Sequence, residues 1–205
     1  MLETGGTPPR GRDAVVAALL EAAGRELAAR GVAGVSIRSV AAGAGVNHGL
    51  VHRHFGSKDG LVAAVLDDLA QRIADRTAAD PGWPFALDGA GPDDELLDRF
   101  VRVLARSLLD GDGRVLQHHH PTMAALVARL RDRGLDEDAA RLGSAQVAAL
   151  TLGWLLFEPF LEASAALPPA ERGGRRRALG HAAEGLVTRL VTPPSGRPVR
   201  TEPPG

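Results

Sequence analysis

A short segment in the first third of the chain concentrates side chains that can donate hydrogen bonds to phosphates and to the edges of bases. It carries His48, His52, Arg53, His54 and Lys58. Asp59 is the only acidic residue between positions 31 and 62. Because arginine and lysine neutralise phosphates, and arginine can bind guanine through two hydrogen bonds, this composition favours a nucleic-acid interface.

Two short helices joined by a tight turn are expected to position these side chains. Ser36 is a suitable N-cap for the first helix, since its hydroxyl can accept a hydrogen bond from an otherwise unpaired backbone N–H. This helix is expected to run to about Gly43. Gly45 follows Ala41 by four residues, and two such small residues would let the next helix start close against the first.

The second helix of the pair is expected to expose a basic, hydrogen-bonding face. Asn47 can cap it. Its inward anchors are Val46, Leu50 or Val51, and Phe55, and its outer positions are His48, Gly49, Leu50, His52, Arg53 and His54. A short helix of this kind suits insertion into the DNA major groove. A solvated helical hairpin with incidental charge is the alternative that composition leaves open.

Residues 36–61 resemble the signature of the tetracycline-repressor (TetR) family. The three-helix head of that family ends in a pattern close to Gly-Val-Ser-x-Gly-x-x-Tyr-x-His-Phe-x-Ser-Lys-Glu-x-Leu. Asn47 stands at the usual Ser or Thr, His52 at the usual Tyr, and Asp59 at the acidic position. Both replacements keep a hydrogen-bonding group, and His52 adds a pH dependence that tyrosine would lack. The matching residues are Gly45, Val46, Gly49, His54, Phe55, Ser57, Lys58 and Leu61.

The resemblance implies an all-α regulator with a helix-turn-helix head and a helical domain for ligand binding and dimerisation. Such proteins are homodimers that bind near-palindromic operators on double-stranded DNA, usually as repressors, and a small-molecule effector releases them. By the resemblance, Arg38 would lie over the DNA backbone. The residues expected to contact phosphates are Asn47, His52, His54 and Lys58, and those expected to face base edges are His48, Gly49, Leu50 and Arg53.

Two longer helices complete the expected head. Asp13 opens the first, and Gly31 ends it. Ser57 caps a long helix that leads out of the head and carries Lys58 in its first turn, where free backbone N–H groups favour a phosphate. The inward stripe of this helix comprises Leu61, Val62, Val65, Leu66, Leu69 and Ile73. The expected divisions are a disordered arm at 1–12, the head with its connecting helix at 13–78, a helical domain at 79–192 and a disordered tail at 193–205.

The second half of the chain reads as further helices. One runs from Asp93 with Leu97, Phe100, Val101, Leu104 and Leu108 inward, and another starts at Pro121. A helix over about 136–150 leads into an apolar run over 152–161, which is expected to be buried in a core or an interface and to kink at Pro159. A last helix starts near Pro168. Residues 145–165 and 170–191 are expected to form the dimer interface.

The inward aromatic and flexible side chains of this half are candidates for an effector pocket, although each could be ordinary core. They are Trp83, Phe100, Leu104, Leu116, Met123, Leu126, Trp154 and Phe157. The effector is expected to be apolar or amphipathic. Glu158, inside the apolar run, is expected to be half-exposed or paired, and a ligand contact is the alternative. Arg175, Arg176 and Arg177 are expected to be a solvated helix start.

Composition narrows the remaining classes of function. With 205 residues and a net charge of −1, any attraction for nucleic acid must come from a local patch. Cysteine is absent, which excludes disulfides and thiolate metal sites and fits a reducing cytoplasm. We expect no signal peptide, no apolar run long enough to span a bilayer, no cofactor and no catalytic site.

Two rival functions are kept. The first is a DNA-binding regulator controlled by a protein partner, which would show an exposed apolar patch in place of a closed cavity. The second is a metal-dependent sensor or enzyme built on His118, His119 and His120. Consecutive histidines do not converge on one ion, and no carboxylate or thiol motif lies nearby in the sequence, so this second rival is the weaker.

Overall fold

The computed structural model describes residues 9, 11–80, 82, 91–110, 120–168 and 172–191, and within these ranges it contains helices and no strand. The all-α prediction is thereby confirmed. Most of the predicted arm, the whole tail, Trp83, Leu116, His118 and His119 lie outside the described residues. The helices are α1 (Arg12–Gly34), α2 (Ile37–Gly43), α3 (Gly49–Phe55), α4 (Lys58–Ala79), α5 (Pro92–Asp110), α6 (Pro121–Asp132), α7 (Glu137–Ser164) and α8 (Arg172–Val191).

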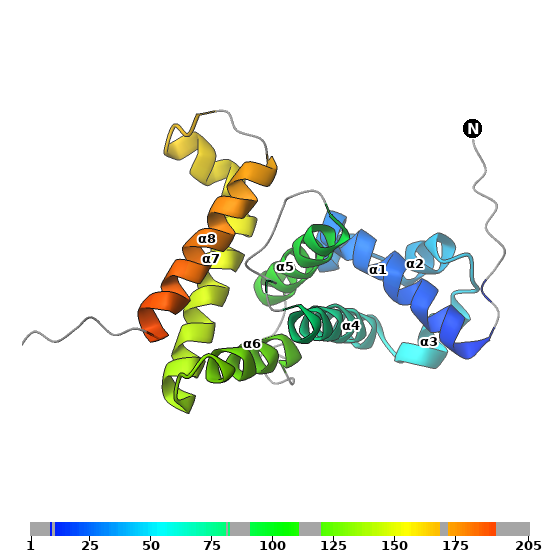
Figure 1. Ribbon diagram of the computed structural model, residues 1–205. Coiled ribbons are helices and arrows are strands. Elements are labelled where there is room, and N and C mark those ends of the chain that lie inside the picture. The colour runs from blue at the N-terminus through cyan, green and yellow to red at the C-terminus, as the bar shows by residue number, and fades with distance from the viewer. Residues whose placement is uncertain are drawn as a thin grey trace, which may run out of the picture.

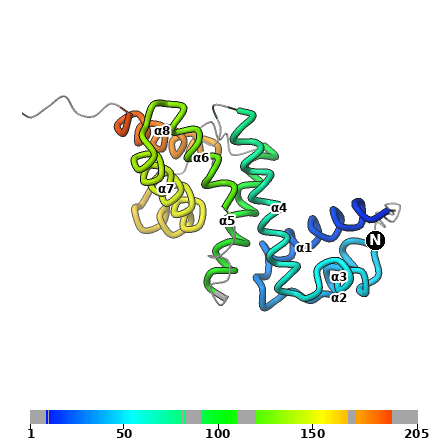
Figure 2. Tube along the Cα trace, turned by 90° about the horizontal axis from the view of Figure 1, so that it is seen from below, coloured from blue at the N-terminus to red at the C-terminus, as the bar shows by residue number. Residues whose placement is uncertain are grey.

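The helices divide the molecule into three regions along its length (Figure 1). The first three helices form a head at one end, α4 and α5 lie in the middle, and α7 and α8 stand side by side at the other end. Seen from below, α4 extends from beside α3 to the region of α6 (Figure 2). Since α4 packs on α1, α3, α5 and α6, it connects the head to the rest of the molecule.

Local sequence signals fix the ends of several helices. The backbone of Gly31 leaves helical geometry, with φ 70° and ψ 175°, so α1 is interrupted where the sequence predicted its end. Pro121 begins α6, as expected for a residue whose missing N–H costs nothing there. Asp136 caps α7, because its side chain accepts a hydrogen bond of 2.8 Å from the backbone N–H of Ala139.

Two apolar clusters form the core. The larger joins the head to α4, α5 and the middle of α7, and it includes all six predicted inward residues of α4. The smaller, built from α6, α7 and α8, includes Leu130 and Val147, which are almost completely buried. Leu150 packs against both clusters, so α7 bridges the two halves of the core.

Helix α7 carries the apolar run and Pro159. It is continuous through Pro159 to Ser164, and the kink expected there stays a prediction. Among the described residues it is the one helix long and apolar enough to cross a bilayer by length and composition alone, and 22% of its most apolar stretch is buried. Leu142, Leu156, Phe157 and Phe160 are exposed along it, with 67% of Phe160 accessible. The apolar run is therefore only partly covered within one chain.

The expectation that the three arginines at the start of α8 are solvated is wrong for Arg176. Arg176 is only 1% exposed and pairs with Asp98 at 2.5 Å and Asp94 at 3.4 Å, both on α5. Arg175 pairs with Glu162 of α7 at 2.7 Å, and only Arg177 is exposed. Leu108, predicted to face inward, is 41% exposed.

The first two turns of α5 form ion pairs with three other helices. Besides the contacts with Arg176, Asp93 accepts a 2.7 Å hydrogen bond from Arg76 of α4, and Arg99 donates one of 2.7 Å to Glu21 of α1. The bond to Asp93 raises the pKa of the Arg76 guanidinium above its usual value. Helix α5 is thus tied to the head on one side and to α8 on the other.

Candidate nucleic-acid interface

Helix α2 is fixed by a reciprocal cap at its start. The Ser36 hydroxyl accepts a 3.0 Å hydrogen bond from the Ser39 backbone N–H, and the Ser36 N–H donates one of 3.3 Å to the Ser39 hydroxyl. The same Ser39 hydroxyl donates a 2.7 Å bond to Glu26 of α1. The predicted cap is confirmed, and it also attaches α2 to α1, which the sequence did not indicate.

The turn between α2 and α3 depends on a left-handed glycine. Gly45 has φ 66°, and its N–H donates to the Ala42 carbonyl at 3.1 Å. A Cβ placed on Gly45 would meet no described atom within 4 Å. The glycine therefore serves the backbone conformation, and the close helix contact expected from its small size is not its function.

Helix α3 is held from inside by Val51, which is fully buried. The position before the helix is His48, which makes no side-chain cap. The predicted capping group is nevertheless in use, because Asn47 Oδ1 accepts a 2.8 Å hydrogen bond from the Gly49 N–H. Val46, Leu50 and Phe55 pack against the larger core cluster, as expected. The rest of the helix surface faces outward.

The start of α4 lies directly against the end of α3. Ser57 caps α4 by accepting a 3.0 Å hydrogen bond from the Gly60 N–H, which places Lys58 in the first turn as predicted. Gly60 is also in contact with the Phe55 carbonyl, since a Cβ added there would overlap that oxygen. The sequence analysis did not single out Gly60, although its place after a capping serine is a usable signal.

A shallow basic groove gathers five of the nine predicted DNA-binding residues. It encloses about 580 Å³ and is lined by Val35, Ser36, Ile37, Arg38, His48, Gly49, His52 and Lys58. Arg38 comes from α2, three of the residues come from the α3 segment and Lys58 comes from α4. The three elements thus converge on one face with two permanent cations and two histidines, which suits a polyanion.

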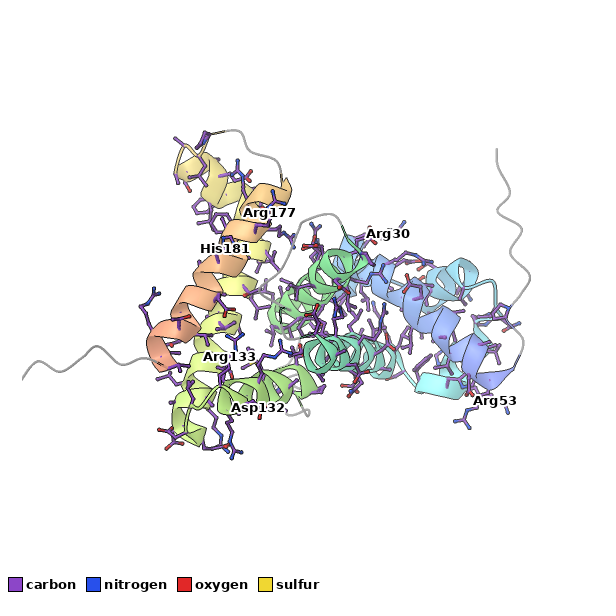
Figure 3. All side chains as sticks on the ribbon, in the orientation of Figure 1. Arg30, Arg53, Asp132, Arg133, Arg177 and His181 are labelled. Atoms are coloured by element: carbon purple, nitrogen blue, oxygen red, sulfur yellow. The ribbon has the colours of Figure 1, made fainter. Side chains whose placement is uncertain are left out.

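The other four predicted residues do not line this groove. Asn47 and Arg53 are exposed, and Figure 3 shows Arg53 projecting from the head on the side away from α7 and α8. His54 is half-buried beside the ring of Phe55, with ring centroids 6.3 Å apart. Leu50 is half-buried against the core, so less of its side chain is available to a base.

The imidazole of His52 has a defined orientation. Its Nδ1 lies 3.2 Å from the Gly56 carbonyl oxygen, at the end of α3. A carbonyl oxygen only accepts hydrogen bonds, so Nδ1 must carry a proton. The other ring nitrogen, Nε2, can then donate to a phosphate only when the ring is the charged imidazolium.

Comparison with known proteins agrees with this geometry. Residues 19–65, from the middle of α1 into α4, match the family model described as bacterial regulatory proteins of the tetR family. A helix-turn-helix-type transcriptional repressor from Mycobacterium tuberculosis is 44% identical over 160 residues, which cover 76% of this chain and 80% of the relative. The chain belongs to the TetR family. A helix-turn-helix-type regulator from Mycobacterium bovis matches with the same identity and coverage.

Solved structures show the same fold beyond the head. A transcriptional regulator from Rhodococcus sp. Rha1 superposes with a TM-score of 0.60 at 23% identity, covering 86% of this chain and 95% of the other. A regulator from Streptomyces coelicolor gives 0.57 at 25% identity, covering 83% and 96%. The family model and the relatives of 44% identity make the protein a TetR-family transcriptional regulator, a class that is normally not enzymatic.

The candidate effector residues of this TetR-family chain fall into separate places. Phe100, Leu104 and Trp154 pack against the larger core cluster, whereas Leu126 belongs to the smaller one. Met123 is half-buried, and Phe157 is 53% exposed within one chain. Trp83 and Leu116 lie outside the described residues. Their role in binding stays a prediction.

Proposed function

We propose that this regulator is a repressor that binds a near-palindromic operator as a homodimer and is released by a small molecule. The observation that carries the proposal is the convergence of Arg38, His48, His52 and Lys58 in one basic groove on the head. The name of the Mycobacterium tuberculosis relative supports repression as the output. We place its action in the cytoplasm, where the DNA is.

The DNA contacts divide by position on the head. Lys58 and the N-terminus of α4 together hold one phosphate, because the free N–H groups and the ammonium both attract an anion. Asn47, His52 and His54 contact further phosphates, and Arg38 lies over the backbone. Arg53 reads a guanine through two hydrogen bonds, and His48, Gly49 and Leu50 meet neighbouring base edges.

The dimer forms through the outward faces of α7 and α8. Leu142, Leu156 and Phe160 are exposed within one chain and recur along α7, while Ala178 and Ala182 of α8 offer small exposed side chains. Two-fold pairing of these faces would bury the apolar stripe against its copy. It would also leave two heads that can meet successive major grooves.

Release requires a ligand that favours a spacing of the heads that does not fit DNA. Helix α4 is the connection through which such a change reaches the head. It is bound to α6 by a 3.1 Å hydrogen bond from the Thr122 hydroxyl to the Ala70 carbonyl, and to α5 by the Arg76–Asp93 pair. A small shift of α5 or α6 would therefore move the end of α4 that carries Lys58. The division into a head at 13–78 and a helical domain at 79–192 belongs to this proposal.

The test is a reciprocal titration. Compounds that raise the thermal unfolding temperature are first selected, and operator affinity is then measured with and without each compound, followed by compound affinity with and without operator. A coupling of about 1–3 kcal/mol would weaken operator binding roughly 5- to 150-fold, and by the same factor in both directions. Compounds that stabilise the protein and leave operator affinity unchanged would contradict the small-molecule switch.

A further inference from the structure

Two buried polar atoms on α7 have no partner among the residues that the structure describes. Oε1 of Glu158 and Nε1 of Trp154 are both closed off from solvent, and neither makes a hydrogen bond. The two residues are one helical turn apart, so their side chains leave the same side of α7. An unpaired carboxylate oxygen and an unpaired indole N–H beside each other are costly in a folded protein.

Neighbouring basic groups do not compensate Glu158. Arg175, at the start of α8, pairs with Glu162, one turn further along α7, at 2.7 Å. Arg176 is directed to α5, where it pairs with Asp94 and Asp98. Both arginines are therefore directed to other carboxylates, and although Nη1 of Arg175 and Nε of Arg176 are themselves buried without a hydrogen bond, Oε1 of Glu158 accepts from neither.

The surroundings of Trp154 are apolar. Trp154 packs against the larger core cluster, which also contains Leu155 and Leu179. A molecule that satisfies both atoms would carry one cationic donor and one oxygen acceptor on a mostly apolar body. The cation would bind Glu158, and the oxygen would accept from the indole N–H of Trp154.

We infer that the effector of this regulator is an amphiphilic amine, recognised by Glu158 through its charge and by Trp154 through an oxygen acceptor. The inference rests on the proposed small-molecule control and names the class of molecule that exerts it. It replaces the broader expectation of an apolar or amphipathic ligand with a positively charged one. It also favours for Glu158 the ligand contact that the sequence left as the alternative to a half-exposed or paired residue.

The experiment uses three aromatic probes that share a ring and differ in charge. They are procaine, a cationic amine with an ester oxygen; benzocaine, the neutral ester without the alkylamine; and the 4-aminobenzoate anion. Calorimetric titration of the full-length protein should give an affinity for procaine at least about tenfold higher than for benzocaine, the size expected for one charge-assisted hydrogen bond. The anion should bind most weakly.

Variants of the protein test whether Glu158 is the residue that makes procaine bind more tightly than benzocaine. In Glu158→Gln the advantage of procaine over benzocaine should disappear. In the control Glu137→Gln it should remain, because Glu137 lies at the far end of α7 and pairs with Arg131 and Arg141. Trp154→Phe, which keeps a ring and removes the N–H, should weaken procaine and benzocaine alike.

Several outcomes would overturn the inference. They are no binding of procaine up to its solubility, equal or tighter binding of benzocaine or of the anion, and a preference that survives Glu158→Gln. Loss of the dimer in Glu158→Gln would also overturn it, because a group of the partner subunit would then be the missing donor.

An operator titration in saturating procaine separates this inference from the proposed function. If procaine binds through Glu158 and operator affinity does not change, the ligand class is supported and the proposed small-molecule control of DNA binding is contradicted. If benzocaine or the anion binds better and releases operator, the proposed small-molecule control is supported and the cationic ligand class is contradicted.

Discussion

Arg53 and Lys58 occupy different parts of the head and should contribute differently to DNA binding. Lys58 lies in the groove at the start of α4, whereas Arg53 projects from α3. Lys58→Ala should weaken binding to all sequences and lower the slope of log affinity against log salt by about one. Arg53→Ala should cost about 1–3 kcal/mol on the specific site and relax preference at one base pair. Equal losses on specific and random DNA for both variants would show that this division of roles is wrong.

His52 should make DNA binding dependent on pH. Its Nδ1–H is held by the Gly56 carbonyl, so a phosphate bond from Nε2 requires the imidazolium. DNA binding through this bond takes up a proton, so operator affinity should be higher in acidic than in alkaline buffer. In His52→Tyr, whose hydroxyl donates without taking up a proton, the pH slope should decrease. The measurement is operator affinity by fluorescence anisotropy at several pH values and constant ionic strength; identical slopes for parent and variant would contradict the assignment.

Single residues also show what the sequence could and could not reveal. The caps at Ser36 and Ser57 and the break at Gly31 were predicted because they depend on neighbours within three or four positions. The burial of Arg176 was missed, because its partners on α5 are distant in the sequence: Asp94 lies 82 positions away and Asp98 lies 78 positions away. The charge of Arg176 indicated exposure to solvent, whereas the fold places two carboxylates of α5 beside it.

At the scale of elements, α5 and α8 are joined by a buried ionic contact whose loss should be severe. Arg176→Ala would leave Asp94 and Asp98 without the guanidinium that faces them, and breaking a buried pair from one side costs about 3–5 kcal/mol. The neighbouring Arg177→Ala is the matched control and should change stability by less than about 0.5 kcal/mol, because Arg177 is exposed. Chemical denaturation measures both free energies of unfolding, and similar values would refute the buried pair.

The elements of the head were predicted better than those of the second half. Short helices with caps and an apolar side are defined by local patterns, and residues 36–61 carry most of that information. In the second half, the spacing of apolar residues predicted the helices, but it did not predict which apolar side chains face the core. Leu108 was assigned inward from its spacing, yet the residue is 41% exposed, because helical spacing defines a face of the helix and not the neighbours that cover it.

At the scale of the whole molecule, dimerisation should depend on the outward face of α7. Phe160→Glu would place a carboxylate in the proposed apolar contact, where desolvation costs several kcal/mol, and should raise the dimer dissociation constant at least about a hundredfold. Leu109→Glu is the control, because Leu109 is 81% exposed on α5 and lies outside that face. Sedimentation equilibrium measures both, and a Phe160→Glu protein that stays dimeric at nanomolar concentration would exclude this interface.

Selection of bound fragments from a random DNA pool by the purified protein tests the central claim most directly. Two linked heads must meet successive major grooves on one side of the duplex, so the enriched sequences should share a two-fold site whose half-sites lie about one helical turn apart. Each site should bind one dimer, and Arg53→Ala should lose enrichment at one symmetric base pair. A pool that shows no enrichment, or that converges on a single asymmetric half-site bound by one chain, would contradict the account.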